Sequence, residues 1–124
     1  MLSVTKEFTF DSAHRLKDYD GACSRLHGHT YKLQVTVFSG DDQLDRTGML
    51  IDFSKLKSAV KEEIIEEFDH RYLNDVLGAN PTAEYMCLYI FAKLAKLPLF
   101  ADLAKMKIRL WETPTSYATY QSEL

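Results

Sequence analysis

The chain has few of the residues that mark proteins without a packed core. Its 124 residues include only two cysteines, which excludes a small domain held together by several disulfides. Five glycines and three prolines exclude a collagen-like chain. No apolar run approaches the roughly 20 residues that cross a bilayer, and the formal net charge of −3 gives no broad cationic face for nucleic acid or anionic lipid. With 46% hydrophobic residues, the sequence predicts one globular domain over residues 1–124.

The amino-terminal segment, MLSVTKEFTF, lacks a cationic start followed by an apolar stretch, so it does not resemble a secretory signal peptide. We therefore expect a cytoplasmic protein in which the thiols of Cys23 and Cys87 remain reduced. Neither nucleic acid nor a membrane is expected as a partner.

Four segments alternate apolar and polar residues with the period of two that is typical of half-buried strands. They are residues 3–10, 27–39, 106–111 and 116–120. Between the first two segments, residues 17–25 are polar and contain a glycine, which predicts a loop.

Two further segments show the spacing of apolar residues that predicts amphipathic helices. The first helix is expected to begin after a cap at Asp52 or Ser54 and to end at Phe68. Residues 69–75 are then predicted to form a loop. The second helix is expected to start with Thr82 as its cap.

The order strand, strand, helix, helix, strand, strand predicts an α+β fold, in which two helices cover one face of a four-stranded antiparallel sheet. Such a sheet has two open edges, and open edges are a liability unless they are covered or pair with another chain. The pattern therefore favours an oligomer.

The chain has four histidines, and three of them are placed to meet. His27 and His29 lie two residues apart at the start of the second strand, so their side chains point to the same side. His14 has the parity of Phe10 if the first strand continues that far. Three imidazoles with an open fourth position make a catalytic zinc site, so we predict one here, although imidazoles also suit iron, nickel and copper.

Cys23 and Cys87 are predicted to differ in role. Cys23 lies in the polar loop four residues before His27, where a nearby cation would stabilise a thiolate that acts as base or nucleophile. Alternatively, Cys23 is a fourth ligand that closes a structural zinc site. Cys87 lies on the apolar stripe of the second helix and is expected to pack as a small hydrophobic residue.

Two further places in the sequence carry ionisable residues that are candidates for a functional site. Asp69 and His70 put a carboxylate beside an imidazole after the first helix, although a histidine there also suits the helix dipole. Glu112 continues the apolar parity of the third strand, so it either faces the core side as a functional carboxylate or marks the strand end emerging into solvent.

Ordered motifs over nearly the whole chain resemble the 6-pyruvoyltetrahydropterin synthase family. They are FTFDSAHRL, CSRLHGHTYKLQV, GMLIDFSKLK, FDHRYLND, NPTAE and the strand end at residues 111–113. The spacing C-x-x-x-H-G-H resembles the bacterial branch that forms 6-carboxy-5,6,7,8-tetrahydropterin in queuosine biosynthesis.

The resemblance implies a role for each matching residue. His14, His27 and His29 match the zinc ligands, and Cys23 matches the catalytic proton acceptor. His70 matches a relay histidine supported by Asp69, and Glu112 matches the residue that holds the pterin ring and joins the relay. Thr82 and Glu84, in NPTAE, match a segment near the pterin.

The resemblance also implies the tunnelling fold, in which the sheets of three subunits join into a barrel and two rings stack as a homohexamer. The implied reaction is a zinc-dependent lyase reaction that converts 7,8-dihydroneopterin triphosphate to 6-carboxy-5,6,7,8-tetrahydropterin, acetaldehyde and triphosphate. Two alternatives stay open: the pyruvoyl-forming reaction on the same substrate, and a non-enzymatic protein with a structural zinc site.

Overall fold

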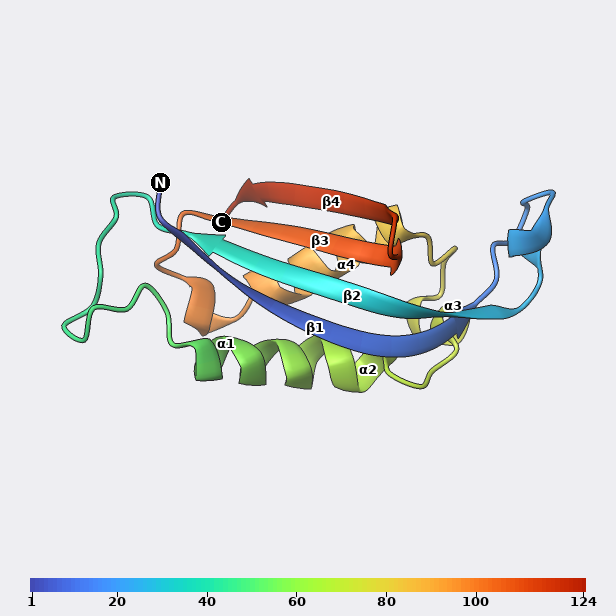
Figure 1. The fold of residues 1–124 in the computed structure, drawn as a ribbon, viewed down its shortest axis with the longest axis horizontal. Helices are drawn as coiled ribbons and strands as arrows, with labels where there is room; N and C mark the ends of the chain where they lie inside the picture. Colours follow the sequence, from blue (N-terminus) through green and yellow to red (C-terminus); the bar gives the residue numbers. More distant parts are fainter.

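A computed structural model describes the whole chain, residues 1–124. Its four strands form one antiparallel sheet in the order β1-β2-β3-β4. Their bounds are β1 Ser3–His14, β2 His27–Phe38, β3 Lys105–Thr113 and β4 Ser116–Glu123. The predicted α+β fold is confirmed, and Figure 1 shows the helices gathered on one side of the sheet.

β1 is longer than the predicted segment, which ended at Phe10. β1 and β2 pair without interruption from Ser3 opposite Phe38 to His14 opposite His27. The far end of β1 is also held on its other edge, where Ala13 N donates to Arg71 O. Bonds on both edges keep the strand extended through His14, although its apolar alternation stops earlier.

The first predicted helix is present as a continuous run of α1 (Phe53–Val60), the π-helical η2 (Lys61–Ile65) and α2 (Glu66–Phe68). Asp52 is the cap, since its carboxylate accepts from Ser54 N at 2.7 Å. The second helix, α4 (Ala83–Ala95), begins with Thr82 as its cap, as predicted.

The prediction of a loop over residues 69–75 is wrong at its end, because α3 spans Leu73–Leu77. Leu73 and Asn74 are buried, and Gly78 ends the helix with φ 64° in the left-handed region. A helix of five residues is too short to show an apolar period, so packing of its buried residues determines it. Two short 3₁₀ turns complete the fold, η1 (Ala22–Ser24) and η3 (Pro98–Phe100).

The hydrophobic core lies between the sheet and the helices and contains 20 buried residues. β2 crosses its centre, where Leu33, Val35 and Val37 have no exposed surface. None of the helices has the length and apolar character that crossing a membrane requires.

The residues on the core-facing side of β2 change from apolar to polar along the strand. Its apolar residues are followed towards the amino-terminal end by Tyr31, then His29, then His27. β3 pairs with β2 only as far as Trp111 opposite Lys32, so the histidine end of β2 has no neighbour on that edge. The sheet thus presents polar side chains where its core face opens to solvent.

Candidate functional site

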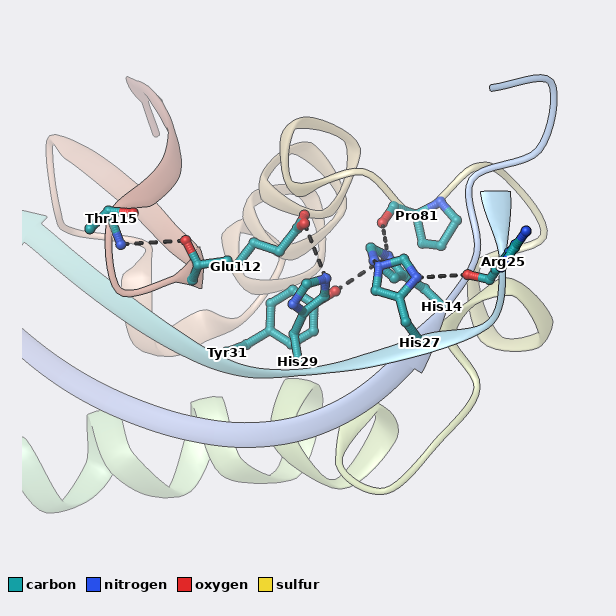
Figure 2. A network of polar contacts seen from close by, with 9 residues as sticks. His14, Arg25, His27, His29, Tyr31, Pro81, Glu112 and Thr115 are labelled. Carbon is teal, nitrogen blue, oxygen red and sulfur yellow. Dashed lines mark hydrogen bonds and ion pairs between the residues drawn. The ribbon is translucent and has the colours of Figure 1, made fainter. Parts of the chain in front are cut away.

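Three histidine side chains converge at this open end of the core face (Figure 2). One ring nitrogen from each of His14, His27 and His29 lies within 4.8 Å of the others. The antiparallel register places His14 opposite His27, and His29 follows two residues along the same face of β2. We call these residues the histidine cluster; their convergence follows the sequence prediction.

Hydrogen bonds to the main chain set which ring nitrogen carries the proton in the neutral form of two of these histidines. His14 Nδ1 lies 2.9 Å from Pro81 O, and His27 Nδ1 lies 2.7 Å from Arg25 O. A carbonyl oxygen only accepts, so each Nδ1 carries the proton and each neutral ring leaves a lone pair on Nε2. These two Nε2 atoms lie 3.0 Å apart. Two lone pairs at that distance repel each other unless a cation or a proton lies between them.

The third ring, His29, also offers a free nitrogen. Its Nε2 is buried and makes no hydrogen bond of acceptable geometry, although Glu112 Oε1 lies 3.2 Å away. Burial is the main cause that lowers the pKa of His29, while the Glu112 carboxylate opposes that shift. The ring is therefore neutral at pH 7, which is the form that binds a metal ion.

The residues present fit a metal ion. The cluster supplies three imidazole nitrogens, two of them oriented by main-chain carbonyls, as is usual for histidine ligands. Three nitrogen donors suit zinc and other transition metals better than the oxygen-preferring magnesium or calcium. A three-ligand site leaves a position for water or substrate, as catalytic metal sites require.

The sequence pattern did not indicate the groups behind the cluster. Tyr31 is fully buried, and its hydroxyl lies 3.3 Å from His14 Nδ1. Burial raises the pKa of Tyr31, so the hydroxyl stays protonated. The parity of Tyr31 with His27 and His29 is the signal that could have identified it, whereas main-chain carbonyls such as Pro81 O leave no trace in the sequence.

Asp69 and His70 form a separate pair beside the end of β1, on the edge opposite β2. Asp69 Oδ1 lies 3.0 Å from His70 Nδ1 and also accepts from Asp11 N at 3.0 Å. These contacts, first of all that from Asp11 N, lower the pKa of Asp69, so it is a carboxylate at neutral pH. The His70 side chain is 79% exposed and is not part of the histidine cluster.

Two hollows meet beside the cluster, and His29 lines both. The larger, of about 590 Å³, reaches His70 at one side, and the smaller, of about 500 Å³, reaches Glu112 at the other. Gly28 also lines both. A Cβ at Gly28 would lie 3.6 Å from Ser12 O, which is an ordinary contact. The backbone conformation therefore does not require a glycine at this position.

The remaining predicted site residues lie at other places. Cys23 is half-buried in η1, and its sulfur is not part of the histidine cluster, so this geometry does not form a closed four-ligand site. Thr82 caps α4, accepting from Tyr85 N at 3.1 Å, and Glu84 is exposed in the first turn. Cys87 is buried as expected, and burial raises its thiol pKa to about 11.

Comparison with known proteins identifies the family of this chain. The family model described as 6-pyruvoyl tetrahydropterin synthase matches residues 3–123. The 6-carboxy-5,6,7,8-tetrahydropterin synthase of Haemophilus influenzae is 40% identical over 98% of this chain and 99% of its own length. The protein of the same name from Synechocystis is 41% identical over 98% of this chain and 95% of its own.

A solved structure shows the same fold. The 6-pyruvoyl tetrahydropterin synthase of Caenorhabditis elegans has a TM-score of 0.80 and 27% identity, covering 98% of this chain and 95% of that one. Sequence motifs, fold and family match agree over almost the full length. The chain belongs to the 6-pyruvoyl tetrahydropterin synthase family.

Proposed function

We propose that this protein is a 6-carboxy-5,6,7,8-tetrahydropterin synthase of queuosine biosynthesis. It would convert 7,8-dihydroneopterin triphosphate and water to 6-carboxy-5,6,7,8-tetrahydropterin, acetaldehyde and triphosphate. The relatives with this name cover nearly all of the chain at about 40% identity. The observation that supports the proposal is the histidine cluster. In it the Nε2 atoms of His14 and His27 lie 3.0 Å apart, while the Nδ1 atom of each ring faces a main-chain carbonyl.

His14, His27 and His29 would hold zinc, which when bound supplies a Lewis acid for the hydroxyls of the substrate side chain. Glu112 lines the 500 Å³ hollow and can accept two hydrogen bonds from the guanidine-like edge of a pterin. Thr82 and Glu84, at the start of α4, are assigned to the pterin site by the family motif. These contacts would orient the substrate.

Cys23 is assigned as the proton acceptor at a side-chain carbon of the substrate. The loss of that proton allows triphosphate to leave. Cleavage of a carbon–carbon bond then releases the two-carbon fragment as acetaldehyde, and one water molecule supplies the second oxygen of the product carboxylate. His70, oriented by Asp69 at 3.0 Å, would move a proton to or from a substrate hydroxyl. The orientation of His70 by a carboxylate favours this role over a purely structural contact.

A homohexamer, a dimer of trimers, is part of the proposal. β1 and β4 have no strand neighbour on their outer edges within the chain, and only the end of β1 is bonded there, by residues 69–72. The strongly exposed His70 lies in that segment. Pairing of the parts of the edges that remain open would place a neighbouring subunit near His70, so active sites would lie between subunits. Sedimentation of the wild-type protein should show the hexamer, and an active monomer would overturn this assembly. We also place the protein in the cytoplasm.

The reaction is tested by incubating the metal-loaded protein with 7,8-dihydroneopterin triphosphate and measuring the mass of the pterin product. The proposal predicts 6-carboxy-5,6,7,8-tetrahydropterin. A pterin that keeps its whole side chain would instead support the pyruvoyl-forming reaction. A protein that binds zinc without any turnover would support the structural alternative.

A further inference from the structure

The only two asparagines of the chain hold the loop that carries Cys23. Asn74 accepts from Arg15 N at 2.9 Å through Oδ1 and donates to Arg15 O at 2.9 Å through Nδ2. Asn80 does the same with Lys17, accepting from its N at 2.7 Å and donating to its O at 2.8 Å. Each side-chain amide thus makes the pair of bonds that a neighbouring strand would make. We call these four bonds the asparagine clamp.

The clamp acts on residues 15–17, which follow β1 and end in a turn. Asn74 and Asn80 bond the main chain of Arg15 and of Lys17, on either side of Leu16. Leu16 N donates instead to Cys23 O at 2.8 Å. Residues 15–17 therefore link the two asparagines to the Cys23 turn.

The clamped residues are next to the histidine cluster in the sequence. Arg15 directly follows His14, and Asn80 directly precedes Pro81, whose carbonyl accepts from His14 Nδ1 at 2.9 Å. Asn74 is 8% exposed, and both polar groups of its amide are paired. A buried amide that is fully paired fixes position, because losing either bond leaves a buried polar group unsatisfied.

We propose that Asn74 and Asn80 are positioning residues that set where Cys23 lies relative to the histidine cluster. The inference rests on the proposed function, in which Cys23 accepts the substrate proton. Without the clamp, residues 15–17 are free to move and the Cys23 turn loses its fixed partner. A displacement of about 1 Å of a reacting group can lower a rate about 10²-fold. The histidine cluster keeps its own carbonyl partners, so metal binding persists.

The test compares Asn74→Ala and Asn80→Ala with wild-type protein and with Gln43→Ala, all in the metal-loaded state. Asn80 is exposed, so its variant retains the fold even if the buried Asn74 proves essential for folding. Gln43→Ala removes an exposed amide from the loop that follows β2, at the other end of that strand from the cluster. Three quantities are measured: metal per chain, kcat and KM, and hydrogen exchange of the main-chain amides.

The inference predicts unchanged metal content and faster exchange over residues 15–25, with the exchange of β2 and β3 unchanged. It predicts that kcat falls at least about tenfold while KM changes much less, since the reacting group and not the binding surface is displaced. Gln43→Ala should match wild type in all three measurements.

Three results would overturn the inference: unchanged exchange over residues 15–25 in both asparagine variants, unchanged kcat despite faster exchange, or loss of the metal. Absence of turnover in the wild-type protein would instead refute the proposed function. The exchange measurement would then still decide whether the clamp holds the loop.

Discussion

The Nε2 atoms of His14 and His27 lie 3.0 Å apart, while the Nδ1 atom of each ring faces a main-chain carbonyl. The carbonyls belong to Pro81, just before α4, and to Arg25, at the end of the hairpin loop. The fold itself therefore directs both lone pairs to one point. Such preorganisation lowers the cost of binding a cation, because the ligands do not have to be oriented when it binds.

Replacement of one cluster residue should abolish metal binding. In His27→Ala one of three donors is lost, so both bound zinc and turnover should disappear together. Elemental analysis should give about one zinc per chain in the wild-type protein and almost none in the variant. His70→Ala is the matched control, since His70 is outside the cluster, and it should keep its metal while losing turnover. Full metal occupancy in His27→Ala would contradict the assignment.

Metal binding should depend on pH in a definite direction. Burial lowers the pKa of His29 from its ordinary value of 6.5, so the ring stays neutral to a lower pH than a free imidazole. Protonation competes with the metal, so occupancy should be full at pH 7 and should fall as the solution is acidified. Zinc release can be followed with a chelating dye while circular dichroism monitors the fold. Release that occurs only when the protein unfolds would contradict this prediction.

The two cysteines should react at different rates. Burial raises the pKa of Cys87 to about 11, so it is a protonated, inaccessible thiol, whereas Cys23 is only half-buried. Iodoacetamide at neutral pH should label Cys23 first, and dihydroneopterin should slow that labelling by covering the site. Mass spectrometry of peptides identifies the labelled residue. Earlier labelling of Cys87 would be evidence against an accessible site at Cys23.

Substitution should separate the cysteines in the same way. Cys23→Ala should keep its metal and fold but lose about 10²-fold or more in kcat, the scale expected on deleting a general base. Cys87→Ala should keep its kcat and lose about 1 kcal/mol in the free energy of unfolding, through a small cavity. Normal turnover of Cys23→Ala would require another proton acceptor.

Thr82 has a structural contact that its assignment to the pterin site did not include. Its hydroxyl accepts from Tyr85 N at 3.1 Å and caps α4. Thr82→Ala should therefore lower the free energy of unfolding by about 1 kcal/mol, while Thr82→Ser should restore it. Denaturant unfolding measures this loss, and KM for the substrate shows whether the residue also contacts the pterin. An unchanged free energy of unfolding would contradict the cap.

The sequence predicted the sheet and the histidine cluster because both follow a period of two. Pairing of β1 with β2 turns the parity of His14, His27 and His29 directly into proximity. The same parity placed Glu112 on the cluster side. Such a pattern can be recognised in the sequence because it consists of the types of the side chains and their spacing.

Other features depend on contacts that leave no pattern. α3 is too short to show a period, and the extension of β1 to His14 depends on Arg71 O. The asparagine clamp joins side chains to main-chain groups about 60 residues away, which no local spacing can reveal. The position of His70 at the β1 edge, apart from the cluster, likewise depends on the whole fold.

In the proposed reaction the bound substrate loses a two-carbon fragment as well as triphosphate. The amount of acetaldehyde released per triphosphate can be measured for the zinc-loaded wild-type protein acting on 7,8-dihydroneopterin triphosphate. We expect one acetaldehyde for each triphosphate, because each turnover releases one molecule of each. Release of triphosphate without acetaldehyde would contradict this expectation and would indicate the pyruvoyl-forming reaction instead.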